Sequence, residues 1–356
     1  MQQQLTIKRI AELAGVSAGT VDRVLHNRGR VSEKAVAAIQ AVLDTQSYKY
    51  NLHTSAVAFK KTRKSLHIVI SIPSSEKGEY WDLVKSGFDK ALQEYGDISI
   101  KSEYLFFDQF NSLSCREVFE TIASMQCSAV VLGTTFAQET RELCVRLDER
   151  GIPYIFVDGM VPETNPIATF MVNQETCGRL LARLMDGLTP AGKELAVLLP
   201  KRIGTQISTN SASRLDAFRS YFQGRMPGRT LKEGFFSTEN SSMVTREVDS
   251  FLKDNPEVGG IAVVISAGYL VADALNDSGH EGIVVGGFDV TDGNARCVRE
   301  GTIDFLINQH PDRQGFSAVE SLLHYLLYGA PDKNMKQLLP IDIVFMENLS
   351  SWVTGD

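Results

Sequence analysis

The sequence of 356 residues lacks the features that mark several classes of protein. Its cysteines stand far apart, and no Cys-X-X-Cys pair or Cys/His cluster occurs. This scatter predicts reduced thiols rather than a disulfide framework or a zinc site. No apolar run approaches the roughly 20 residues that span a bilayer. The N-terminal residues also lack the apolar segment of a signal peptide, so we expect a cytoplasmic protein.

Motifs for catalysis and for metal or nucleotide binding are missing as well. The six histidines show no ligand spacing, and no Ser-His-Asp or Cys-His arrangement can be recognised. Residues 187–193 have the spacing of a phosphate-binding loop. However, Glu194 stands where a metal-binding Ser or Thr is required, and the segment precedes a strand instead of following one. The sequence therefore predicts no enzyme, no bound metal and no cofactor.

Charge is distributed unevenly along the chain. Residues 1–65 contain eleven Lys or Arg and four acidic residues, a net charge of +7, whereas the remaining residues carry −14. A basic region followed by an acidic one suggests that the first contacts a polyanion. The alternative is a basic surface that faces only water.

The chain is longer than the roughly 250–300 residues that one hydrophobic core can serve, so we expect two or three domains.

Residues 1–47 show the pattern of three short helices. Thr6, Ser17 and Ser32 are each suited to cap a following helix, and glycines at 15 and 29 separate the segments. Apolar residues at helical spacing are expected to face inward: Ile7, Ile10, Ala11 and Ala14; Val21, Val24 and Leu25; and Val36, Ile39, Val42 and Leu43. Two helices joined by a tight turn form a helix-turn-helix, whose second helix enters the major groove of DNA.

The start of the second predicted helix carries the residues that we expect to contact DNA. Arg23, one turn into the helix, is expected to read a guanine, whereas Ser17 and Thr20 suit phosphates. The small residues Ala18 and Gly19 allow close approach of the backbone. Four residues that follow are expected to contact phosphates rather than bases: His26, Asn27, Arg28 and Arg30. The predicted DNA-binding residues here are Thr6, Ser17, Ala18, Gly19, Thr20, Arg23, His26, Asn27 and Arg30.

The run TIKRIAELAGVSAGTVDRVLHNRGRV, from Thr6 to Val31, resembles the DNA-binding head of the lactose/galactose repressor family. Asp22 departs from the serine that is common there. The resemblance implies that residues 48–65 form a hinge with a short helix, which inserts an apolar wedge into the minor groove. Val57, followed by Ala58, falls at the wedge position. Phe59 is the alternative, and a third interpretation is that Val57 packs only against the hinge of a dimer mate.

From residue 66 onward, strand-like and helix-like segments alternate. Alternation of this kind is typical of doubly wound parallel sheets with helices on both faces. The predicted strands are 66–72, 98–107, 128–133, 154–158, 168–172, 195–199, 230–236, 261–266 and 283–289. Ligands bind such sheets at the carboxyl ends of strands. This rule points to 71–76, 133–136, 158, 201–208, 266–269, 288–292 and 308–310.

This alternating part resembles the core that the same family shares with type I periplasmic sugar-binding proteins. The resemblance implies two lobes, the first formed by 66–164 and 308–329 and the second by 165–307 and 330–356. A small sugar-like effector would bind between them. Residues at matching motif positions or strand ends are the predicted effector contacts: Tyr80, Trp81, Thr134, Asp158, Arg214, Asp289 and Gln309.

Three of these residues have a structural alternative. Trp81 could belong to the core, Arg214 could form a salt bridge on its helix, and Asp289 could cap the following turn. The same motifs imply a flat aromatic side chain and planar bidentate groups, which suit the apolar faces and polar rim of a sugar.

Together these features predict a transcription regulator, of the repressor type, that binds operator DNA as a homodimer and responds to a sugar-like effector. The alternatives are a transport-type sugar-binding protein and an α/β enzyme. The basic head argues against the first, and the missing reactive constellation argues against the second. The sequence leaves open whether the effector weakens or strengthens DNA binding, and whether dimers pair into tetramers.

Overall fold

The computed structural model describes residues 7–25, 31–32, 34–36, 38–39, 42, 65–96, 99–204, 207–225, 229–329 and 335–353. The chain divides into two compact units, Met1–Lys64 with Leu326–Gly329, and Ser65–Tyr325 with Ala330–Asp356. We call residues 1–64 the head and the rest the body, and describe each by itself. Residues 43–64 lie outside the described residues, so the predicted division at 47/48 stays a prediction.

The head contains the first two predicted helices, α1 (Ile7–Ala14) and α2 (Ala18–Leu25). Ser17 precedes α2, and its hydroxyl oxygen accepts a hydrogen bond from the Thr20 amide at 3.0 Å. Residues 34–36 and 38–39 are helical, as predicted for the third helix. The Ser32 hydroxyl lies 3.4 Å from the Ala35 amide nitrogen. These contacts confirm the predicted caps at Ser17 and Ser32, whereas Thr6 lies outside the described residues.

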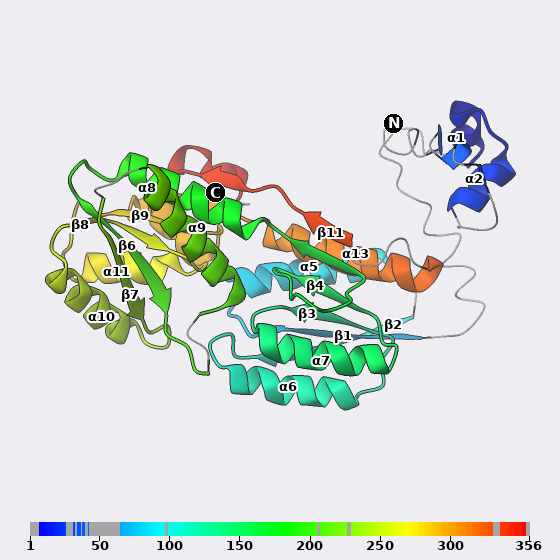
Figure 1. The fold of residues 1–356 in the computed structure, drawn as a ribbon, viewed down its shortest axis with the longest axis horizontal. Helices are drawn as coiled ribbons and strands as arrows, with labels where there is room; N and C mark the ends of the chain where they lie inside the picture. Colours follow the sequence, from blue (N-terminus) through cyan, green and yellow to red (C-terminus); the bar gives the residue numbers. More distant parts are fainter. Residues whose placement is uncertain are drawn as a thin grey trace. The chain divides into compact units, whose positions relative to one another are not determined.

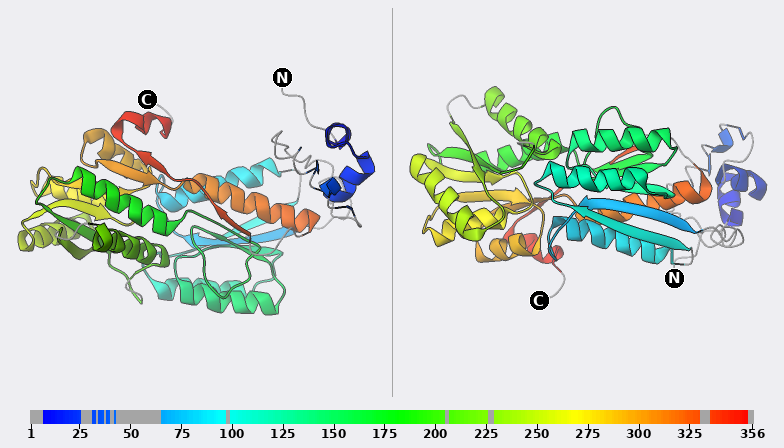
Figure 2. Two further views of the ribbon diagram at one scale, coloured as in Figure 1. Left: turned by 45° about the horizontal axis from the view of Figure 1, so that its top comes forward. Right: turned by 90° about the horizontal axis from the view of Figure 1, so that it is seen from below.

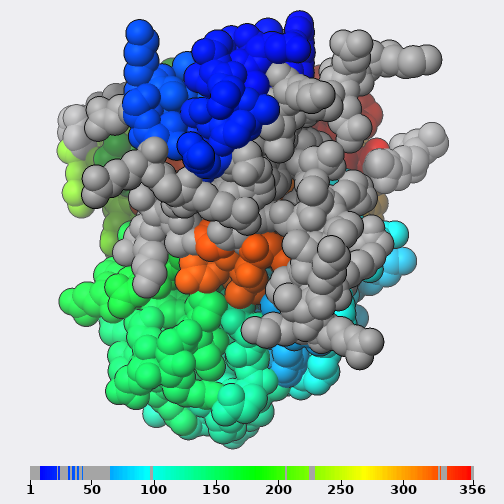
Figure 3. Space-filling view, turned by 90° about the vertical axis from the view of Figure 1, so that its right-hand side faces the viewer, coloured from blue at the N-terminus to red at the C-terminus, as the bar shows by residue number. Residues whose placement is uncertain are grey.

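Apolar side chains from all three segments form one small core in the head. Figure 3 shows the outer surface of the described part of the head in blue. The buried residues are Ile10, Ala11, Val21 and Ile39, against which Ala14, Val16, Val24 and Val42 pack. The prediction that Val36 also faces inward is wrong, because its side chain is 40% exposed. Val36 lies in the first turn of its helix, and a core of this size is too small to cover every apolar side chain.

The body contains two six-stranded sheets with helices on both faces, which confirms the predicted fold class (Figures 1 and 2). The first sheet has the order β11-β5-β4-β3-β1-β2, from β1 (Leu66–Pro73), β2 (Ile100–Phe107), β3 (Ala129–Gly133), β4 (Tyr154–Val157), β5 (Ala168–Met171) and β11 (Met335–Leu338). The second has the order β12-β10-β9-β8-β6-β7, from β6 (Glu194–Pro200), β7 (Leu231–Phe236), β8 (Val258–Val263), β9 (Val284–Phe288), β10 (Phe305–Asn308) and β12 (Asp342–Val344). The described pairs are parallel except that of β10 with β12.

Helices cover both faces of each sheet. In lobe one, α6 (Ser112–Ser124) and α7 (Ala137–Glu149) lie on the opposite face from α5 (Tyr80–Glu94) and α13 (Pro311–Tyr328) (Figure 1). In lobe two, α8 (Gln174–Leu188) packs beside α9 (Thr209–Arg225), and α10 (Ser241–Asp254) beside α11 (Gly268–Asp277). The elements α12 (Asp292–Glu300) and the 3-10 helix η1 (Met346–Ser351) complete lobe two.

Two strands belong to a different lobe from the one predicted. The sequence places 165–307 and 330–356 in lobe two, but β5 pairs with β4, and β11 pairs with β5, in the first sheet. The chain therefore crosses between the lobes after β5, after β10 and after β11. The crossings near 164 and 330 that the resemblance implies are wrong, because β5 still pairs in the first sheet and the chain returns to that sheet at β11.

The second and third crossings lie side by side. His310, just after β10, has a positive φ of 54°. Its Nε2 lies 2.7 Å from the Asp342 Oδ2 at the start of β12. The His310 ring also meets the Trp352 ring edge-on, with centroids 5.3 Å apart. Movement of one lobe against the other must therefore displace these two connections together.

Candidate functional site

A cavity of about 360 Å³ lies between the two lobes, at the carboxyl ends of strands from both sheets. The volume falls in the range of small-molecule sites. Side chains of both lobes line it, among them Ser74, Gln109 and Thr135 of lobe one and Ser208, Thr238 and Ser266 of lobe two. Six of the seven predicted effector contacts line the cavity: Tyr80, Trp81, Thr134, Asp158, Arg214 and Gln309.

Asp158 is a buried carboxyl that lies directly after β4. Its φ of 74° is unusual for a residue with a side chain, and such strain often accompanies functional sites. The Tyr80 hydroxyl donates to Oδ1 at 2.6 Å, and the Asn210 amide donates to Oδ2 at 2.8 Å. Burial raises the pKa of Asp158 in spite of these donors. Because Asn210 belongs to lobe two, the carboxyl group connects the two walls of the cavity.

Arg214, on α9, is held by acceptors at all three guanidinium nitrogens. Nε donates to Gln174 Oε1 at 2.7 Å, Nη1 to the Val264 carbonyl at 2.8 Å, and Nη2 to Gln309 Oε1 at 2.5 Å. The guanidinium also lies 3.9 Å from the centroid of the Phe288 ring. None of these acceptors is a carboxylate. Among the described residues, Arg214 therefore does not form the salt bridge on its own helix that was the alternative prediction. In this arrangement Arg214 organises the wall of the cavity.

Asp289 lies directly behind the cavity wall, with a side chain that is 0% exposed. Its carboxylate accepts hydrogen bonds from the Ser266 hydroxyl at 2.6 Å and from the Gln309 side chain at 2.7 Å. Thr291, not Asp289, caps the following helix. The prediction that Asp289 contacts the effector therefore stays a prediction, since Ser266 and Gln309 lie between Asp289 and the cavity.

Trp81 is both a core residue and a lining residue. It is 4% exposed and meets the Tyr80 ring edge-on, with centroids 5.2 Å apart. A Cβ atom at Gly133 would lie 2.9 Å from the indole, so the glycine at the end of β3 allows the indole to lie there. The two interpretations of Trp81 are therefore compatible.

The head presents the start of α2 at its surface. Ser17, Ala18, Gly19 and Arg23 are exposed, whereas Thr20 is half-buried with its hydroxyl 2.8 Å from that of Ser17. This exposure is what contact with DNA requires. The other predicted DNA contacts lie outside the described residues: Thr6, His26, Asn27, Arg30, Val57 and Ala58.

Two family models match the chain. The model of the periplasmic binding protein domain matches residues 68–330, and that of the bacterial regulatory proteins, lacI family, matches residues 6–51. The chain therefore belongs to the family of the periplasmic binding protein domain, which covers most of it, and carries a head of the lacI family.

The proteins that this chain resembles include regulators and sugar-binding proteins. The HTH-type transcriptional regulator EndR of Paenibacillus polymyxa is 24% identical over 217 residues, which are 60% of this chain and 59% of that protein. A structure from Bacteroides fragilis, assigned as a LacI transcriptional regulator, is 26% identical with a TM-score of 0.76, over 82% of this chain and 100% of that chain. GanP, a glucose-galactose binding protein of Geobacillus stearothermophilus, has a TM-score of 0.71 over 81% of this chain and 100% of that chain. At 18% identity, it shows the fold alone.

On one side of the cavity in the periplasmic binding protein domain, the lobes touch through Gly78 and Asp292. The Asp292 amide donates to the Gly78 carbonyl at 3.1 Å. The neighbouring Glu79 shares a hydrogen bond with Tyr269 of lobe two. Burial, together with the charges of Asp292 and Glu76, raises the pKa of Glu79 to about 7. The contact therefore includes a carboxyl group that changes its charge near neutral pH.

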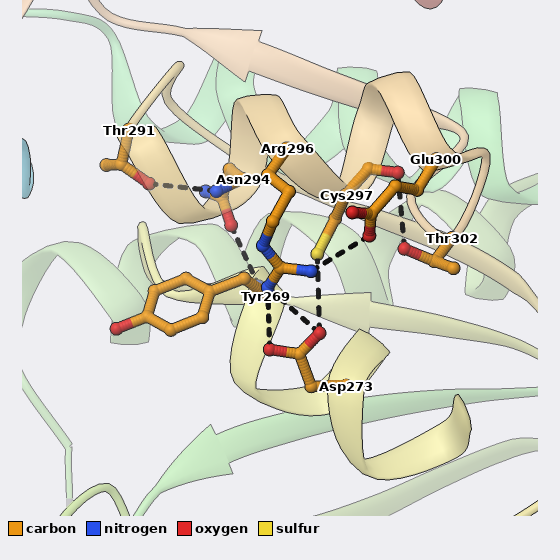
Figure 4. Close-up of polar contacts among 8 residues, drawn as sticks. All are labelled: Tyr269, Asp273, Thr291, Asn294, Arg296, Cys297, Glu300 and Thr302. Carbon is orange, nitrogen blue, oxygen red and sulfur yellow. Dashed lines mark hydrogen bonds and ion pairs between the residues drawn. The ribbon is translucent and has the colours of Figure 1, made fainter. Parts of the chain in front are cut away.

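The lobe-two side of this contact is fixed by bonds between α11 and α12 (Figure 4). The Tyr269 amide donates to Asn294 Oδ1 at 2.8 Å, and the Asn294 amide donates to Thr291 Oγ1 at 3.3 Å. Further along the two helices, Arg296 forms a pair of hydrogen bonds to Asp273 at 2.7 and 2.9 Å. Tyr269 is thereby held where it meets Glu79.

On the other side of the cavity, the loop after β6 contacts the loop after β2. The Ile203 amide donates to the Phe110 carbonyl at 2.7 Å, and the Ser112 amide donates to the Ile203 carbonyl at 3.1 Å. Arg202 Nη1 donates to the Gln109 carbonyl at 2.6 Å. The structure is thus a closed form in which the lobes meet on both sides of the cavity.

Sequence reasoning missed several residues of this site. Gln174 and Asn210 stand in the first turns of helices, and neither has a motif that distinguishes it from a surface amide. Glu79 and Tyr269 become important only because the lobes meet. Within the part of the chain that the structure describes, no group of His, Cys, Asp and Glu could hold a metal ion. No described helix is long and apolar enough to cross a membrane.

Proposed function

We propose that this chain is a transcription regulator that binds DNA through its head and responds to a small sugar-like effector in the cavity between its lobes. The observation that carries the proposal is the presence, in one chain, of a helix-turn-helix head and a closed two-lobed cavity. A binding protein without the head would have no means of acting on DNA, and the head alone would have no means of sensing a ligand.

The head supports the DNA-binding part of the proposal. Arg23 is exposed one turn into α2, where a side chain can reach the guanine edge in the major groove. Ser17 caps the helix through the Thr20 amide, and the positive end of the helix dipole at this exposed turn attracts a phosphate. The net charge of +7 over residues 1–65 adds attraction for any DNA sequence.

The cavity supports the effector-binding part. A ligand with many hydroxyl groups would meet the flat indole of Trp81 and the polar side chains of Asn210, Ser266 and Gln309. Such a ligand would bind both lobes at once and favour the closed form over an open one. We expect the chain to act as a homodimer, since two heads on a near-palindromic site would double the contacts with DNA. No step in this function requires a catalytic group.

The experiment separates the two activities by two substitutions. Duplexes that the full-length chain selects from a random library serve as the DNA, and binding is measured by gel shift. Arg23→Ala is expected to weaken binding to the selected duplex by about 1–3 kcal/mol while leaving ligand responses intact. Ala267→Phe fills the cavity that Ala267 lines and is expected to abolish thermal stabilisation by sugars while DNA binding persists.

Arg9→Ala is the matched control, because Arg9 is an exposed arginine of the head that pairs with Glu12 on α1 at 2.8 Å. It should retain the preference for the selected duplex over a random one. The DNA-binding part of the proposal is wrong if Arg23→Ala retains that preference too. The effector-binding part is wrong if Ala267→Phe responds to sugars as the wild-type chain does.

A further inference from the structure

Arg202 and Arg214, the two arginines that line the cavity, differ in the number of hydrogen-bond acceptors that surround the guanidinium. Each of the three guanidinium nitrogens of Arg214 has an acceptor. For Arg202, in the loop after β6, the described residues supply one acceptor, the Gln109 carbonyl, which receives Nη1 at 2.6 Å. Its enclosed Nε has no hydrogen-bond partner among them. A guanidinium offers five N–H donors, so most donors of Arg202 have no acceptor among the described residues.

The charge of Arg202 also lacks a close counterion. Within the described part of the chain, no carboxylate oxygen lies within 4.0 Å of its guanidinium. The acid that acts on it from farther away is Asp108, which is exposed and accepts a hydrogen bond from the Phe110 amide at 2.8 Å. Burial lowers the pKa of Arg202 to about 10, so the group stays charged at neutral pH. A partly buried cation without a partner is unfavourable, and such groups often mark binding sites.

Aromatic rings of lobe one hold this guanidinium in place. Its central carbon lies 5.3 Å from the centroid of the Phe110 ring and 5.6 Å from that of Phe136. These rings follow β2 and β3, whereas Arg202 belongs to lobe two. The side chain is therefore ordered before a ligand arrives, which lowers the entropy that binding costs.

Hydroxyl groups of both lobes line the same cavity as Arg202. Thr135, next to Phe136 in the chain, lines the cavity, and its enclosed Oγ1 has no hydrogen-bond partner among the described residues. Thr238 lines the cavity as well. A guanidinium with neighbouring hydroxyl donors is the donor set that carboxylates and phosphates prefer. The buried acids Asp158 and Asp289, in contrast, accept hydrogen bonds from protein donors around Arg214.

We propose that the effector carries an anionic group, a carboxylate or a phosphate, and that Arg202 binds this group. The inference rests on the proposed function, because it takes the cavity to be the effector site. A sugar acid and a sugar phosphate share this chemistry, since each combines hydroxyl groups for the walls near Asn210 and Gln309 with an oxyanion for Arg202. A neutral sugar leaves Arg202 without its partner and binds more weakly.

The test compares the thermal midpoint of the full-length chain with three kinds of probe, in buffer free of phosphate. The probes are inorganic phosphate alone, and two sets that each contain a neutral sugar, its uronate and its 6-phosphate, based on D-glucose and D-galactose. We expect an anionic probe to raise the wild-type midpoint more than its neutral parent does. Arg202→Met, which keeps the length of the side chain but removes its charge, should weaken that response by about tenfold or more in apparent affinity.

Lys201→Met is the matched control, because Lys201 is the adjacent cation but pairs with Glu247 at 2.5 Å on the surface. It should respond to anions as the wild-type chain does. Arg202→Gln is the second variant, to be used if Arg202→Met unfolds at a lower temperature than the wild-type chain without ligand. A response to the uronate alone assigns a carboxylate, and a response to the 6-phosphate alone assigns a phosphate.

Two results would overturn the inference. One is a neutral sugar that stabilises the wild-type chain as strongly as its anionic partners, with an unchanged response in Arg202→Met. In that case the effector site stands and its anionic character is wrong. The other is a wild-type midpoint that no anion shifts. In that case the neutral sugars decide about the proposed function. If they shift the midpoint, the effector site stands, and if they do not, the proposed effector function is wrong as well.

Discussion

Replacing Arg214 by methionine tests whether the network around this residue stabilises the body. The variant keeps an apolar stem against the Phe288 ring but leaves the Gln174 and Gln309 side-chain oxygens and the Val264 carbonyl without their donor. Hydrogen bonds from a charged donor are worth about 1.5–3 kcal/mol each, and they do not add fully. Removing one member of a buried charged network costs about 3–5 kcal/mol. We therefore expect a loss of about 4 kcal/mol, a large part of an ordinary domain's stability.

The loss should depend on pH in a defined direction. Burial raises the pKa values of Asp158 and Asp289, and the charge of Arg214 lowers both. Without Arg214 both pKa values rise further. A carboxyl group with a folded pKa above its unfolded value destabilises the protein above the folded pKa, and protonation relieves this as pH falls. The difference between wild type and variant should therefore shrink as the pH falls toward the ordinary pKa range of carboxyl groups.

Urea unfolding followed by tryptophan fluorescence measures this difference, because both tryptophans, Trp81 and Trp352, lie in the body. Arg219→Met is the matched control on the same helix, since Arg219 is 40% exposed and pairs with Glu233 at 2.7 Å. A surface pair of this kind is worth about 1 kcal/mol or less. The reasoning is refuted if Arg214→Met costs no more than Arg219→Met, or if its cost grows as the pH falls.

Two further predictions concern the contact between the lobes at Gly78 and Glu79. Glu79→Gln removes a carboxyl whose pKa is raised from 4.5 to about 7. The wild-type body should therefore lose about 1–3 kcal/mol of unfolding free energy relative to the variant as pH rises through that range, and parallel pH profiles in urea unfolding would contradict this. Gly78→Ala places a methyl carbon 2.1 Å from Asp292 Oδ2, so the lobes should separate and the radius of gyration in X-ray scattering should rise. Gly279 is the control, because it shares the positive φ, at 70°, but has open space around it. If Gly279→Ala raises the radius of gyration as well, the clash with Asp292 does not explain the effect of Gly78→Ala.

The fold could be predicted where strands are apolar and buried throughout. Residues 66–72 are an example, because β1 lies between β2 and β3 in the middle of lobe one. The strand β11 was not predicted, since its four residues MKQL are all exposed and carry no apolar pattern. The lobe of β5 was predicted wrongly, since its apolar sequence suits either sheet.

The site could be predicted as far as it depends on strand ends. That rule led to Thr134 and Asp158, which follow β3 and β4 and line the cavity. Gln109 and Thr238 follow the edge strands β2 and β7 and also line the cavity, but nothing in the sequence shows that edge strands reach it. The environment of Arg202 depends on rings at positions 110 and 136, far away in the sequence. Pairings at such a distance are set by the packing of the lobes.

The three crossings between the lobes have a consequence for the order in which the body folds. Neither lobe is a continuous stretch of chain, because β11, at residues 335–338, completes a sheet that begins at residue 66. During synthesis, β11, the last strand of the first sheet, is therefore made only after every strand of the second sheet except β12. Domains usually fold as units while the chain is being synthesised, and contacts between distant residues slow folding. We expect the body to acquire its final structure late and in a single step, with both lobes completed only when nearly the whole chain has left the ribosome.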